Sequence, residues 1–340
     1  MNPKLRDVAE HAGVSVRTVS NVVNGFRYVA PATRERVQAS IDALGYRPNL
    51  AARTLRRGRT GLVALVIPEI DSPYFAELAA RTVRIAGARG MTVLIDQTDG
   101  DAEREKELLH GRRSQLVDGV LFSPWAVAPA ELAARTDTVP LVLLGEHDGT
   151  AGVDHVAIDN VAAAREATGH LLGSGRRRVA ALGIQPRSLN ATARQRLAGY
   201  RQALAEAGLP AEPDLEVPVR RLHRADGHQA MLRLLDLAQP PDAVFCFTDE
   251  LALGALRAAA DRRVAVPEAL ALVGFDDIED GRYSVPALTT VSPDKDRIAE
   301  LALDRLARQA AAPEPPRSIV APHHLEVRET SRACGAAAAG

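Results

Sequence analysis

Several acidic, basic and aromatic residues of the sequence follow short apolar runs, at positions where a ligand could reach them. The clearest case is the run 62–67, which is followed by an aspartate and two aromatic residues. Those that follow apolar runs are Asp71, Tyr74, Phe75, Trp125, Asp249 and Asp276, with Thr248 directly before Asp249, and Arg196 opens a segment of helical period. Charged groups form strong hydrogen bonds with hydroxyls, and aromatic rings cover apolar C–H faces. This combination therefore suits a polyhydroxylated small molecule.

The elements that must position this set have the pattern of an α/β fold. Apolar runs at 62–67, 92–95, 119–122, 141–144, 156–158, 179–182, 243–247 and 270–275 alternate with segments of helical period. Such alternation indicates parallel sheets covered by helices. Eight or more strands in about 270 residues favour two doubly wound lobes, and a single (β/α)₈ barrel is the alternative. In open α/β sheets a ligand binds at the carboxyl ends of the strands.

A second kind of chemistry is indicated by the charge of the first 60 residues. They hold eleven basic and four acidic side chains, a net charge of +7, whereas the whole chain has −1. The remainder therefore has about −8. A basic head on an acidic body indicates a polyanionic partner at one end. A solvated basic segment without a partner is the alternative.

Three short helices are expected in this basic region. Leu5, Val8, Ala9 and Ala12 lie on one helical face, and Gly13 ends that helix. Ser15 is an N-cap for a second helix that starts at Val16, whose residues 19 and 23 face the core, and a third helix runs from about 31 to Gly45. A tight turn between the first two helices is typical of a helix-turn-helix. Another small helical bundle fits the same pattern.

Longer motifs resemble a known family. Residues 5–24 (LRDVAEHAGVSVRTVSNVVN), 33–37 (TRERV) and 44–49 (LGYRPN) are similar to the N-terminal signature of the lactose/galactose repressor family. Residues 71–75, 194–200, 248–254, 274–277 and 286–291 resemble motifs of its larger domain. The resemblance extends from residue 4 to about 310. It implies a DNA-binding transcriptional regulator with an N-terminal all-α helix-turn-helix domain and an α/β two-lobed periplasmic-binding-protein-like domain of doubly wound parallel sheets.

The resemblance also implies roles in DNA recognition. The second helix would lie in the major groove of double-stranded DNA, with Val16, Arg17 and Asn21 against base edges. Arginine suits a guanine edge and asparagine suits adenine, while Thr18, Ser20 and Asn24 would contact phosphates. Ala30 replaces the serine that often caps the third helix in the family, and a lost cap costs about 1 kcal/mol.

Residues 48–60 form the joint between head and body. They are basic and rich in helix formers, and too short for a stable isolated helix. By composition alone they are a flexible linker. The resemblance implies instead a hinge helix that pairs with its copy in the minor groove, with Leu55 wedged into a base step and Arg53 and Arg56 near phosphates.

In the body, the resemblance identifies Arg196 and Asp276 as the first candidates for effector binding, with Asp249 next. Asp249 could instead cap a helix, Tyr74 and Phe75 could be core residues, and Trp125 could lie on the surface or in a dimer contact. Thr248 stands where the family usually has asparagine, and a hydroxyl forms fewer hydrogen bonds than an amide.

The expected domains are 1–47 for the helix-turn-helix, 48–60 for the hinge, 61–330 for the effector and dimerisation domain, and 331–340 for a disordered tail. Lobe 1 would contain 61–159 and 291–320, and lobe 2 would contain 160–290 and 321–330. The resemblance implies a homodimer on a pseudo-palindromic operator, a small-molecule effector that is a sugar or sugar derivative, and repression as the output.

Other functional classes find less support in the sequence. It contains no G-x-S-x-G, Walker or H-E-x-x-H motif, so we expect neither enzyme nor cofactor. His323, His324 and Cys334 are expected to be solvent-exposed, and no metal is expected. No long apolar run or signal peptide occurs, and two cysteines suggest reduced thiols in a cytoplasmic protein with no membrane contact. A transport-type solute-binding protein, or an enzyme on the same scaffold, remains the alternative.

Overall fold

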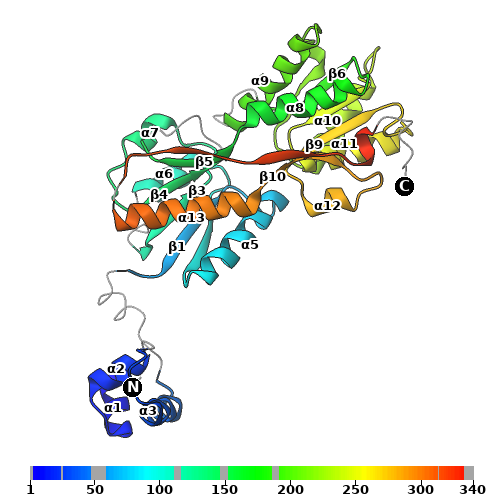
Figure 1. The fold of residues 1–340 in the computed structure, drawn as a ribbon. Helices are drawn as coiled ribbons and strands as arrows, with labels where there is room; N and C mark the ends of the chain where they lie inside the picture. The colour runs from blue at the N-terminus through cyan, green and yellow to red at the C-terminus, as the bar shows by residue number, and fades with distance from the viewer. Residues whose placement is uncertain are drawn as a thin grey trace. The chain divides into compact units, whose positions relative to one another are not determined.

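The computed structural model describes residues 3–23, 26–46, 59–110, 116–145, 152–185, 191–312 and 314–332. Contacts divide the chain into unit 1, Met1–Gly61, and unit 2, Leu62–Gly340 (Figure 1). Asn24, Arg53, Leu55, Arg56 and Cys334 lie outside the described residues, as do most of the expected hinge and the end of the tail. The predictions made for them remain predictions.

Unit 1 contains helices α1 (Leu5–Ala12), α2 (Val16–Val23) and α3 (Pro31–Leu44) among its described residues. Gly13 and Gly45 end α1 and α3 in the left-handed conformation that favours glycine. The Ser15 hydroxyl accepts a hydrogen bond from the Thr18 backbone N–H at 3.1 Å, so it caps α2 as predicted. The core is formed by Val8, Ala9, Ala12, Val19, Val22, Val37 and Tyr46.

Lobe 1 of unit 2 is built on a six-stranded sheet of order β11-β5-β4-β3-β1-β2. Its strands are β1 (Leu62–Ile67), β2 (Thr92–Gln97), β3 (Gly119–Phe122), β4 (Leu141–Leu144), β5 (Asp154–Ile158) and β11 (Ser318–Ala321). Its helices are α5 (Pro73–Ala88), α6 (Ala102–His110), α7 (Pro129–Ala133) and α13 (Lys295–Ala311). All strand pairs in this sheet are parallel.

Lobe 2 is built on a second six-stranded sheet, of order β12-β10-β9-β8-β6-β7. Its strands are β6 (Val179–Ile184), β7 (Glu216–Pro218), β8 (Ala243–Cys246), β9 (Ala271–Phe275), β10 (Thr289–Pro293) and β12 (His323–Glu326). Only the pair β10–β12 is antiparallel. Its helices are α8 (Asn160–Gly173), α9 (Ala191–Glu206), α10 (Arg224–Leu235), α11 (Asp249–Asp261) and α12 (Glu279–Arg282).

Each sheet has a point where the strand order reverses, and these points position the site. In lobe 1 the chain moves from β1 to β2 on one side and returns to β3 on the other, and in lobe 2 it moves from β6 to β7 and returns to β8. Right-handed crossovers then place the connecting helices on opposite faces of the sheet. The loops after β1, β3 and β8 open at these reversals, where open α/β sheets bind ligands. The two-lobed, doubly wound fold is confirmed, and the barrel alternative is wrong.

The chain crosses between the lobes three times. The crossings lie between β5 and α8, between β10 and α13, and between β11 and β12. Since β10 pairs in the second sheet as far as Pro293, the second crossing lies later than the predicted boundary at 290–291. Figure 1 shows α13 lying along lobe 1 beside α5.

Parts of the C-terminal region were not predicted. The sequence pattern did not identify α13 as a helix or β12 as a strand; in β12, His324 is exposed as predicted and His323 is partly buried. The Cys246 thiol is buried and unpaired, and burial raises its pKa. No helix among the described residues is long and apolar enough to cross a membrane.

Candidate functional site

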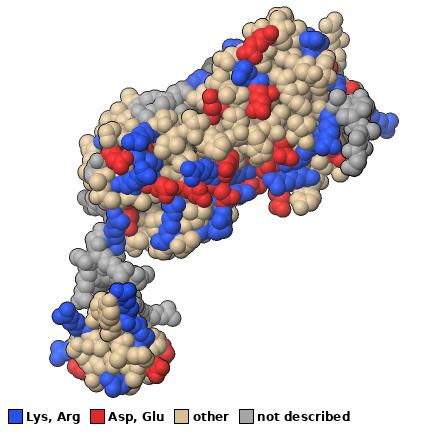
Figure 2. All heavy atoms as spheres, viewed as in Figure 1, with Lys and Arg blue, Asp and Glu red and all other residues tan. Residues whose placement is uncertain are grey.

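The first candidate site is the exposed face of α2 in unit 1. Val16 is 43% exposed although it is apolar, Arg17 is exposed, and Thr18, Ser20 and Asn21 are partly exposed. Val19 and Val22 point into the core and fix the orientation of the helix. These five, which are the described members of the set predicted to meet DNA, thus lie on the outward side of the helix. Figure 2 shows basic side chains at several points of the visible face of unit 1.

Hydrogen bonds fix both ends of α2. At its start the hydroxyls of Ser15 and Thr18 are 2.8 Å apart, in addition to the capping bond. Beyond its end, the Arg34 guanidinium on α3 donates to the Phe26 carbonyl at 2.7 Å. The exposed face is therefore held by a small rigid scaffold, as a surface that reads a groove requires.

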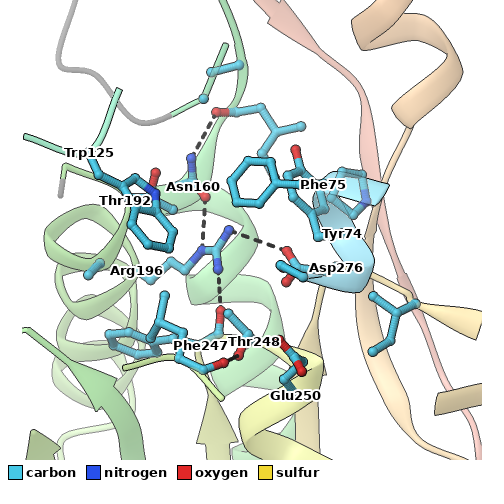
Figure 3. A pocket seen from close by; sticks show the side chains of 18 of the residues that line it. Tyr74, Phe75, Trp125, Asn160, Thr192, Arg196, Phe247, Thr248, Glu250 and Asp276 are labelled. Carbon is cyan, nitrogen blue, oxygen red and sulfur yellow. Dashed lines mark hydrogen bonds and ion pairs between the residues drawn. The ribbon is translucent and has the colours of Figure 1, made fainter. Parts of the chain in front are cut away.

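The second candidate site is a pocket between the two lobes of unit 2 (Figure 3). Lobe 1 contributes residues that follow β1, β3 and β4 and residues of β5, and lobe 2 contributes residues of α8 and α9 and residues that follow β8 and β9. Its polar and aromatic lining is Glu69, Ser72, Tyr74, Phe75, Trp125, Asn160, Thr192, Arg196, Phe247, Thr248, Glu250 and Asp276. Of the predicted effector residues, six line it: Tyr74, Phe75, Trp125, Arg196, Thr248 and Asp276.

Arg196 on α9 is the centre of the pocket's polar contacts. Its Nε donates to the Asn160 side-chain oxygen at 3.1 Å, and its Nη1 donates to the Phe247 carbonyl. Its Nη2 lies 3.7 Å from the Asp276 carboxylate, and the guanidinium carbon lies 3.5 Å from the centre of the Phe275 ring. Arg196 is only 8% exposed. Its guanidinium is thus fixed in position before any ligand arrives.

Aromatic side chains form the wall of lobe 1. The Tyr74 and Phe75 rings meet edge to face with centres 5.2 Å apart, and Phe75 meets Trp125 in the same way at 6.1 Å. Phe75 is 5% exposed, so it serves the core and the pocket at once. Figure 3 shows this wall facing the polar cluster around Arg196.

Acidic residues from both lobes stand at the pocket. Glu69 follows β1 in lobe 1, and Glu250 is in α11 of lobe 2. His223 lies near both carboxylates, with its Nε2 3.4 Å from Glu69 and its Nδ1 3.7 Å from Glu250. Burial raises the pKa of Glu250, and His223 and Arg224 oppose that shift. His223 therefore links a carboxylate of each lobe at the edge of the pocket.

A second link between the lobes lies at α5. The Glu77 carboxylate accepts hydrogen bonds from the Lys295 ammonium at 2.7 Å and from the Glu279 backbone N–H at 3.0 Å. Lys295 is buried and also donates to the Asp277 carbonyl at 3.0 Å. The loop after β9, which carries Asp276 into the pocket, is thus tied to lobe 1.

Thr248 has its hydroxyl engaged within lobe 2. It accepts the Leu251 backbone N–H at 3.2 Å as the N-cap of α11, and it donates to the Leu222 carbonyl at 3.4 Å. A hydroxyl has one donor and two acceptor sites. It has therefore no second proton to donate to a ligand, unlike the asparagine usual in the family.

Two predicted effector residues do not line the pocket. Asp71 is exposed, and Glu69 and Ser72 line the pocket in its place. Asp249 is completely buried, and its carboxylate accepts hydrogen bonds from the Thr290 hydroxyl at 2.6 Å and from the Ile278 backbone N–H at 2.9 Å. Burial and the nearby Asp276 raise the pKa of Asp249 well above its ordinary value. Its role is to hold the loops after β8 and β9 together.

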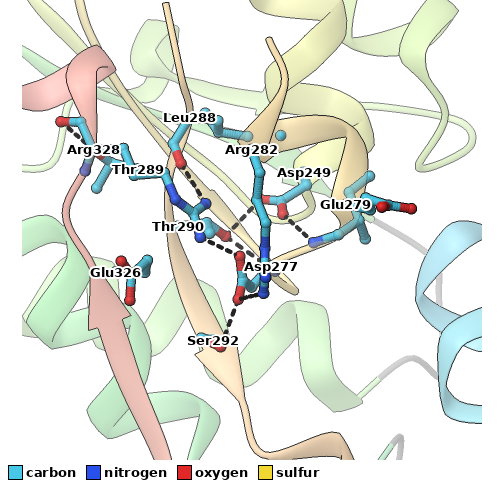
Figure 4. A network of polar contacts seen from close by, with 12 residues as sticks. Asp249, Asp277, Glu279, Arg282, Leu288, Thr289, Thr290, Ser292, Glu326 and Arg328 are labelled. Carbon is cyan, nitrogen blue, oxygen red and sulfur yellow. Dashed lines mark hydrogen bonds and ion pairs between the residues drawn. The ribbon is translucent and has the colours of Figure 1, made fainter. Parts of the chain in front are cut away.

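Asp249 belongs to a polar network behind the pocket (Figure 4). Gly274 passes so close to it that a Cβ there would lie 2.1 Å from an Asp249 carboxylate oxygen. In the same network the Asp277 carboxylate accepts from Arg328 at 2.6 Å and from Arg282 at 2.7 Å. Although burial opposes it, these hydrogen bonds lower the pKa of Asp277 to about 2. The network supports the loop that presents Asp276.

Comparisons with known proteins agree with both sites. Residues 4–49 match the family described as bacterial regulatory proteins, lacI family, and residues 168–331 match a periplasmic binding protein-like domain. Catabolite control protein A from Priestia megaterium is 33% identical over 335 residues, covering 98% of this chain and 100% of that protein. The chain belongs to the LacI family. This family is one of DNA-binding transcriptional regulators, which decides against a transport-type solute-binding protein.

Two solved LacI-type structures extend the likeness to the fold. The transcriptional regulator CelR in complex with cellobiose is 32% identical, with a TM-score of 0.70 and coverage of 97% of this chain and 100% of that one. The lac repressor dimer bound to operator and the anti-inducer ONPF is 28% identical, with a TM-score of 0.85 and coverage of 97% and 99%. The LacI-family architecture predicted from the sequence is confirmed.

Some pocket residues of this LacI-family chain were missed by the sequence reasoning. Glu69 follows β1 and Asn160 follows β5, so the strand-end rule that selected Asp276 could have found both. Glu250 is adjacent to Asp249, and Thr192 lies one helical turn before Arg196 on α9, but only the fold shows that both face the pocket. Within the described residues, no cluster of three or more histidine, cysteine or acidic side chains could hold a metal ion.

Proposed function

We propose that the protein is a transcriptional repressor whose affinity for its operator is set by a sugar or sugar derivative bound between the lobes. The observation that carries the proposal is the cluster of Arg196, Asp276 and Asn160 opposite an aromatic wall, in the same chain as a helix-turn-helix. The proposal gives the chain no catalytic role.

The pocket offers the groups that a polyhydroxylated ligand needs. The carboxylates of Asp276 and Glu69 can accept hydrogen bonds from hydroxyls, and charge-assisted bonds of this kind are the strong ones. The faces and edges of Tyr74, Phe75 and Trp125 can cover apolar C–H groups. The structural relative CelR was solved with cellobiose, a sugar, which supports this ligand class.

On the DNA side, we propose that a homodimer reads a pseudo-palindromic operator through two copies of α2. Val16, Arg17 and Asn21 would contact base edges, and Thr18 and Ser20 would contact phosphates. A two-fold dimer requires half-sites about one helical turn apart. The lac repressor, a structural relative, was solved as a dimer on its operator. Asn24, Arg53, Leu55 and Arg56 are proposed as further DNA contacts on the family resemblance alone.

The two sites are coupled in this proposal through the relative position of the lobes. The contacts of the Glu279 backbone with Glu77, of Lys295 with the Asp277 carbonyl, and of His223 with Glu69 join the lobes outside the ligand contacts. A ligand that prefers one arrangement of the lobes shifts that equilibrium. Couplings of this kind amount to about 1–3 kcal/mol.

A thermal melt of the full chain against a panel of sugars, sugar phosphates, nucleobases and organic acids tests the ligand side. A ligand present at about 100 times its Kd adds about 2.7 kcal/mol to stability, so a sugar that binds raises the melting midpoint. The Arg196→Ala variant is the matched control and should not respond. A panel in which only nucleobases or acids raise the midpoint would overturn the sugar assignment.

The DNA side is tested with duplexes that the protein selects from a random pool. The selected sequences should contain an inverted repeat, and fluorescence anisotropy should show that the sugar identified by melting changes the affinity for them. Selection of no common sequence would contradict the proposal of sequence-specific binding. Unchanged affinity with the sugar bound would contradict the coupling.

A further inference from the structure

The loop between β3 and α7 carries Trp125 into the pocket and is held by a single buried side chain. The Glu105 carboxylate, from α6, accepts the backbone N–H of Trp125 at 2.9 Å, of Ala126 at 2.8 Å and of Val127 at 2.9 Å. Glu105 is completely buried. Three successive N–H groups around one carboxylate form an anion-binding concavity of the kind made by backbone nests. The loop therefore takes its conformation from Glu105.

The turn after β2 completes this arrangement. The Thr98 hydroxyl donates to the same Glu105 carboxylate at 3.2 Å and accepts the Gly100 backbone N–H at 3.3 Å. Gly100 packs against the indole, since a Cβ there would lie 3.0 Å from Trp125 Cε3. Phe75 meets the indole from another direction. The position of the ring is thus fixed by the backbone on which it sits and by the atoms around it.

The indole itself has an unused donor. Its Nε1 is enclosed by protein, and no described residue accepts a hydrogen bond from it. A buried N–H without an acceptor is unfavourable, because the group has lost its bonds to water. Trp125 lines the pocket, so a molecule between the lobes can supply the missing acceptor.

We infer that Glu105 is a positioning residue that fixes Trp125 as the lobe 1 wall of the effector site, and that the indole N–H donates to an oxygen atom of the effector. The donor half of this inference, the hydrogen bond from the indole to the effector, rests on the proposed function. The positioning half, the placement of Trp125 by Glu105, concerns the free protein. The effector must then present an uncharged or anionic oxygen to lobe 1, in addition to the groups that meet Arg196 and Asp276.

The positioning half is tested by fluorescence of the ligand-free full chain, since Trp125 is the only tryptophan. The Glu105→Gln variant cannot accept all these N–H groups with one amide oxygen. We expect its emission to move to longer wavelength and acrylamide quenching to increase several-fold. Glu103→Gln is the control, because Glu103 is an exposed residue of the same helix that pairs only with Lys106 among described contacts.

A second variant covers the case in which Glu105→Gln does not fold. Thr98→Val removes the hydroxyl that donates to the Glu105 carboxylate without a large change in volume, and it should change the emission in the same direction. Circular dichroism confirms that each variant is folded. If both variants fold and their emission and quenching match the wild type, the positioning role is overturned.

The donor half is tested with D-glucose, D-ribose and cellobiose as probes. A probe that raises the melting midpoint should also change the emission of Trp125. Replacing the tryptophan by benzothienylalanine, whose sulfur cannot donate, should weaken that probe about tenfold, as expected for one hydrogen bond. Unchanged affinity overturns the donor role. If no probe binds, the proposed sugar-binding function and the donor role fail together, whereas the ligand-free comparison still decides the positioning role.

Discussion

The side chains that would meet DNA stand on an exposed helix face in unit 1, whereas those that would meet the effector in unit 2 are buried and bonded to one another. Arg17 is exposed on α2, while Arg196 is 8% and Asp276 is 6% exposed. On α2, the buried side chains are those of Val19 and Val22, which are not among the residues predicted to contact DNA. In the pocket, Phe75 and Arg196 are buried parts of the structure and are also proposed to bind the effector.

This difference follows from the partners. A helix that reads a groove meets a large rigid surface and needs only a firm scaffold beneath it. A pocket must enclose a small molecule, so its charged groups leave water and need partners before the ligand arrives. We therefore expect binding and stability to be separable by mutation in unit 1 and inseparable in unit 2.

The largest effect is expected at Asp277, in the network behind the pocket. Asp277→Ala removes the carboxylate that Arg328 and Arg282 share; the Arg282 side chain is half-exposed, but breaking the buried pair with Arg328 costs about 3–5 kcal/mol. Urea unfolding followed by Trp125 fluorescence measures the loss in unit 2. The control is Asp296→Ala, which removes an exposed partner of Arg84 and should cost less than about 1 kcal/mol. Equal losses in the two variants would contradict the special position of the network.

Acid should reproduce the loss of Asp277 in the wild type. Its pKa is about 2 in the folded protein and 3.8 ordinarily, so the unfolded chain binds the proton more readily. The stabilisation is complete above the ordinary value and disappears as pH falls towards 2. Between these values the wild type should lose more stability than Asp277→Asn in the same urea experiment. Parallel curves for the two proteins would show that Asp277 is not held in its charged form.

The next largest effect tests whether binding and stability are inseparable in the pocket. Arg196→Ala should weaken the sugar identified by melting about 100-fold, or about 2.8 kcal/mol, as for the loss of a charged hydrogen-bonding group. It should also lower the free energy of unfolding by about 1–3 kcal/mol, because the buried Asn160 side chain and the Phe247 carbonyl lose the hydrogen bonds that Arg196 donates. Calorimetry and urea unfolding measure the two losses. If the affinity for the sugar falls while the free energy of unfolding is unchanged, then binding and stability are separable in the pocket and this expectation is wrong.

How far the sequence predicts the structure differs between the two units for the same reason. In unit 1 the helix boundaries depend on local signals, namely the apolar period of α1, the Ser15 cap and Gly13, and these were predicted correctly. In unit 2, Asp249 was predicted to line the pocket, but the close approach of Gly274 and Thr290 turns it inward. These neighbours are distant in sequence, so no local pattern contains that information.

Glu105 shows the same limit more sharply. It stands in the run Glu103-Arg104-Glu105-Lys106-Glu107, which has the composition of a solvated helix face. In the structure it is completely buried, because the loop after β3 folds over it and donates three N–H groups. Asp276 and Asp277 are also adjacent, yet one lines the pocket and the other joins the network. Such distinctions are set by tertiary packing.

A smaller effect is expected at Arg17, where binding should change without stability. Arg17→Ala should cost about 1–3 kcal/mol of operator affinity and relax the base preference at one position in each half-site. Because the side chain is exposed and outside the core, hydrogen exchange of the α2 amides should stay as in the wild type. Anisotropy with the selected duplex and its single-base variants measures the first result. An equal loss on every duplex would show that Arg17 contacts phosphate only.

The smallest effect is the converse case in unit 1, a change in stability without a change in binding. Ala30 is the N-cap of α3, with extended backbone (φ −55°, ψ 137°) and no side-chain hydrogen bond. In Ala30→Ser the new hydroxyl can accept the N–H of Thr33, which adds about 1 kcal/mol to the stability of the helix start. Hydrogen exchange of the first turn of α3 in the full chain should slow about fivefold, since 1.4 kcal/mol corresponds to tenfold.

Ala30→Val is the control, because it adds side-chain volume without an oxygen. Operator affinity should be the same in all three proteins, since Ala30 is exposed outside the reading face of α2. If Ala30→Ser altered affinity as much as Arg17→Ala, helix stability and DNA recognition would be coupled in unit 1 as well, and the contrast between the two units would fail.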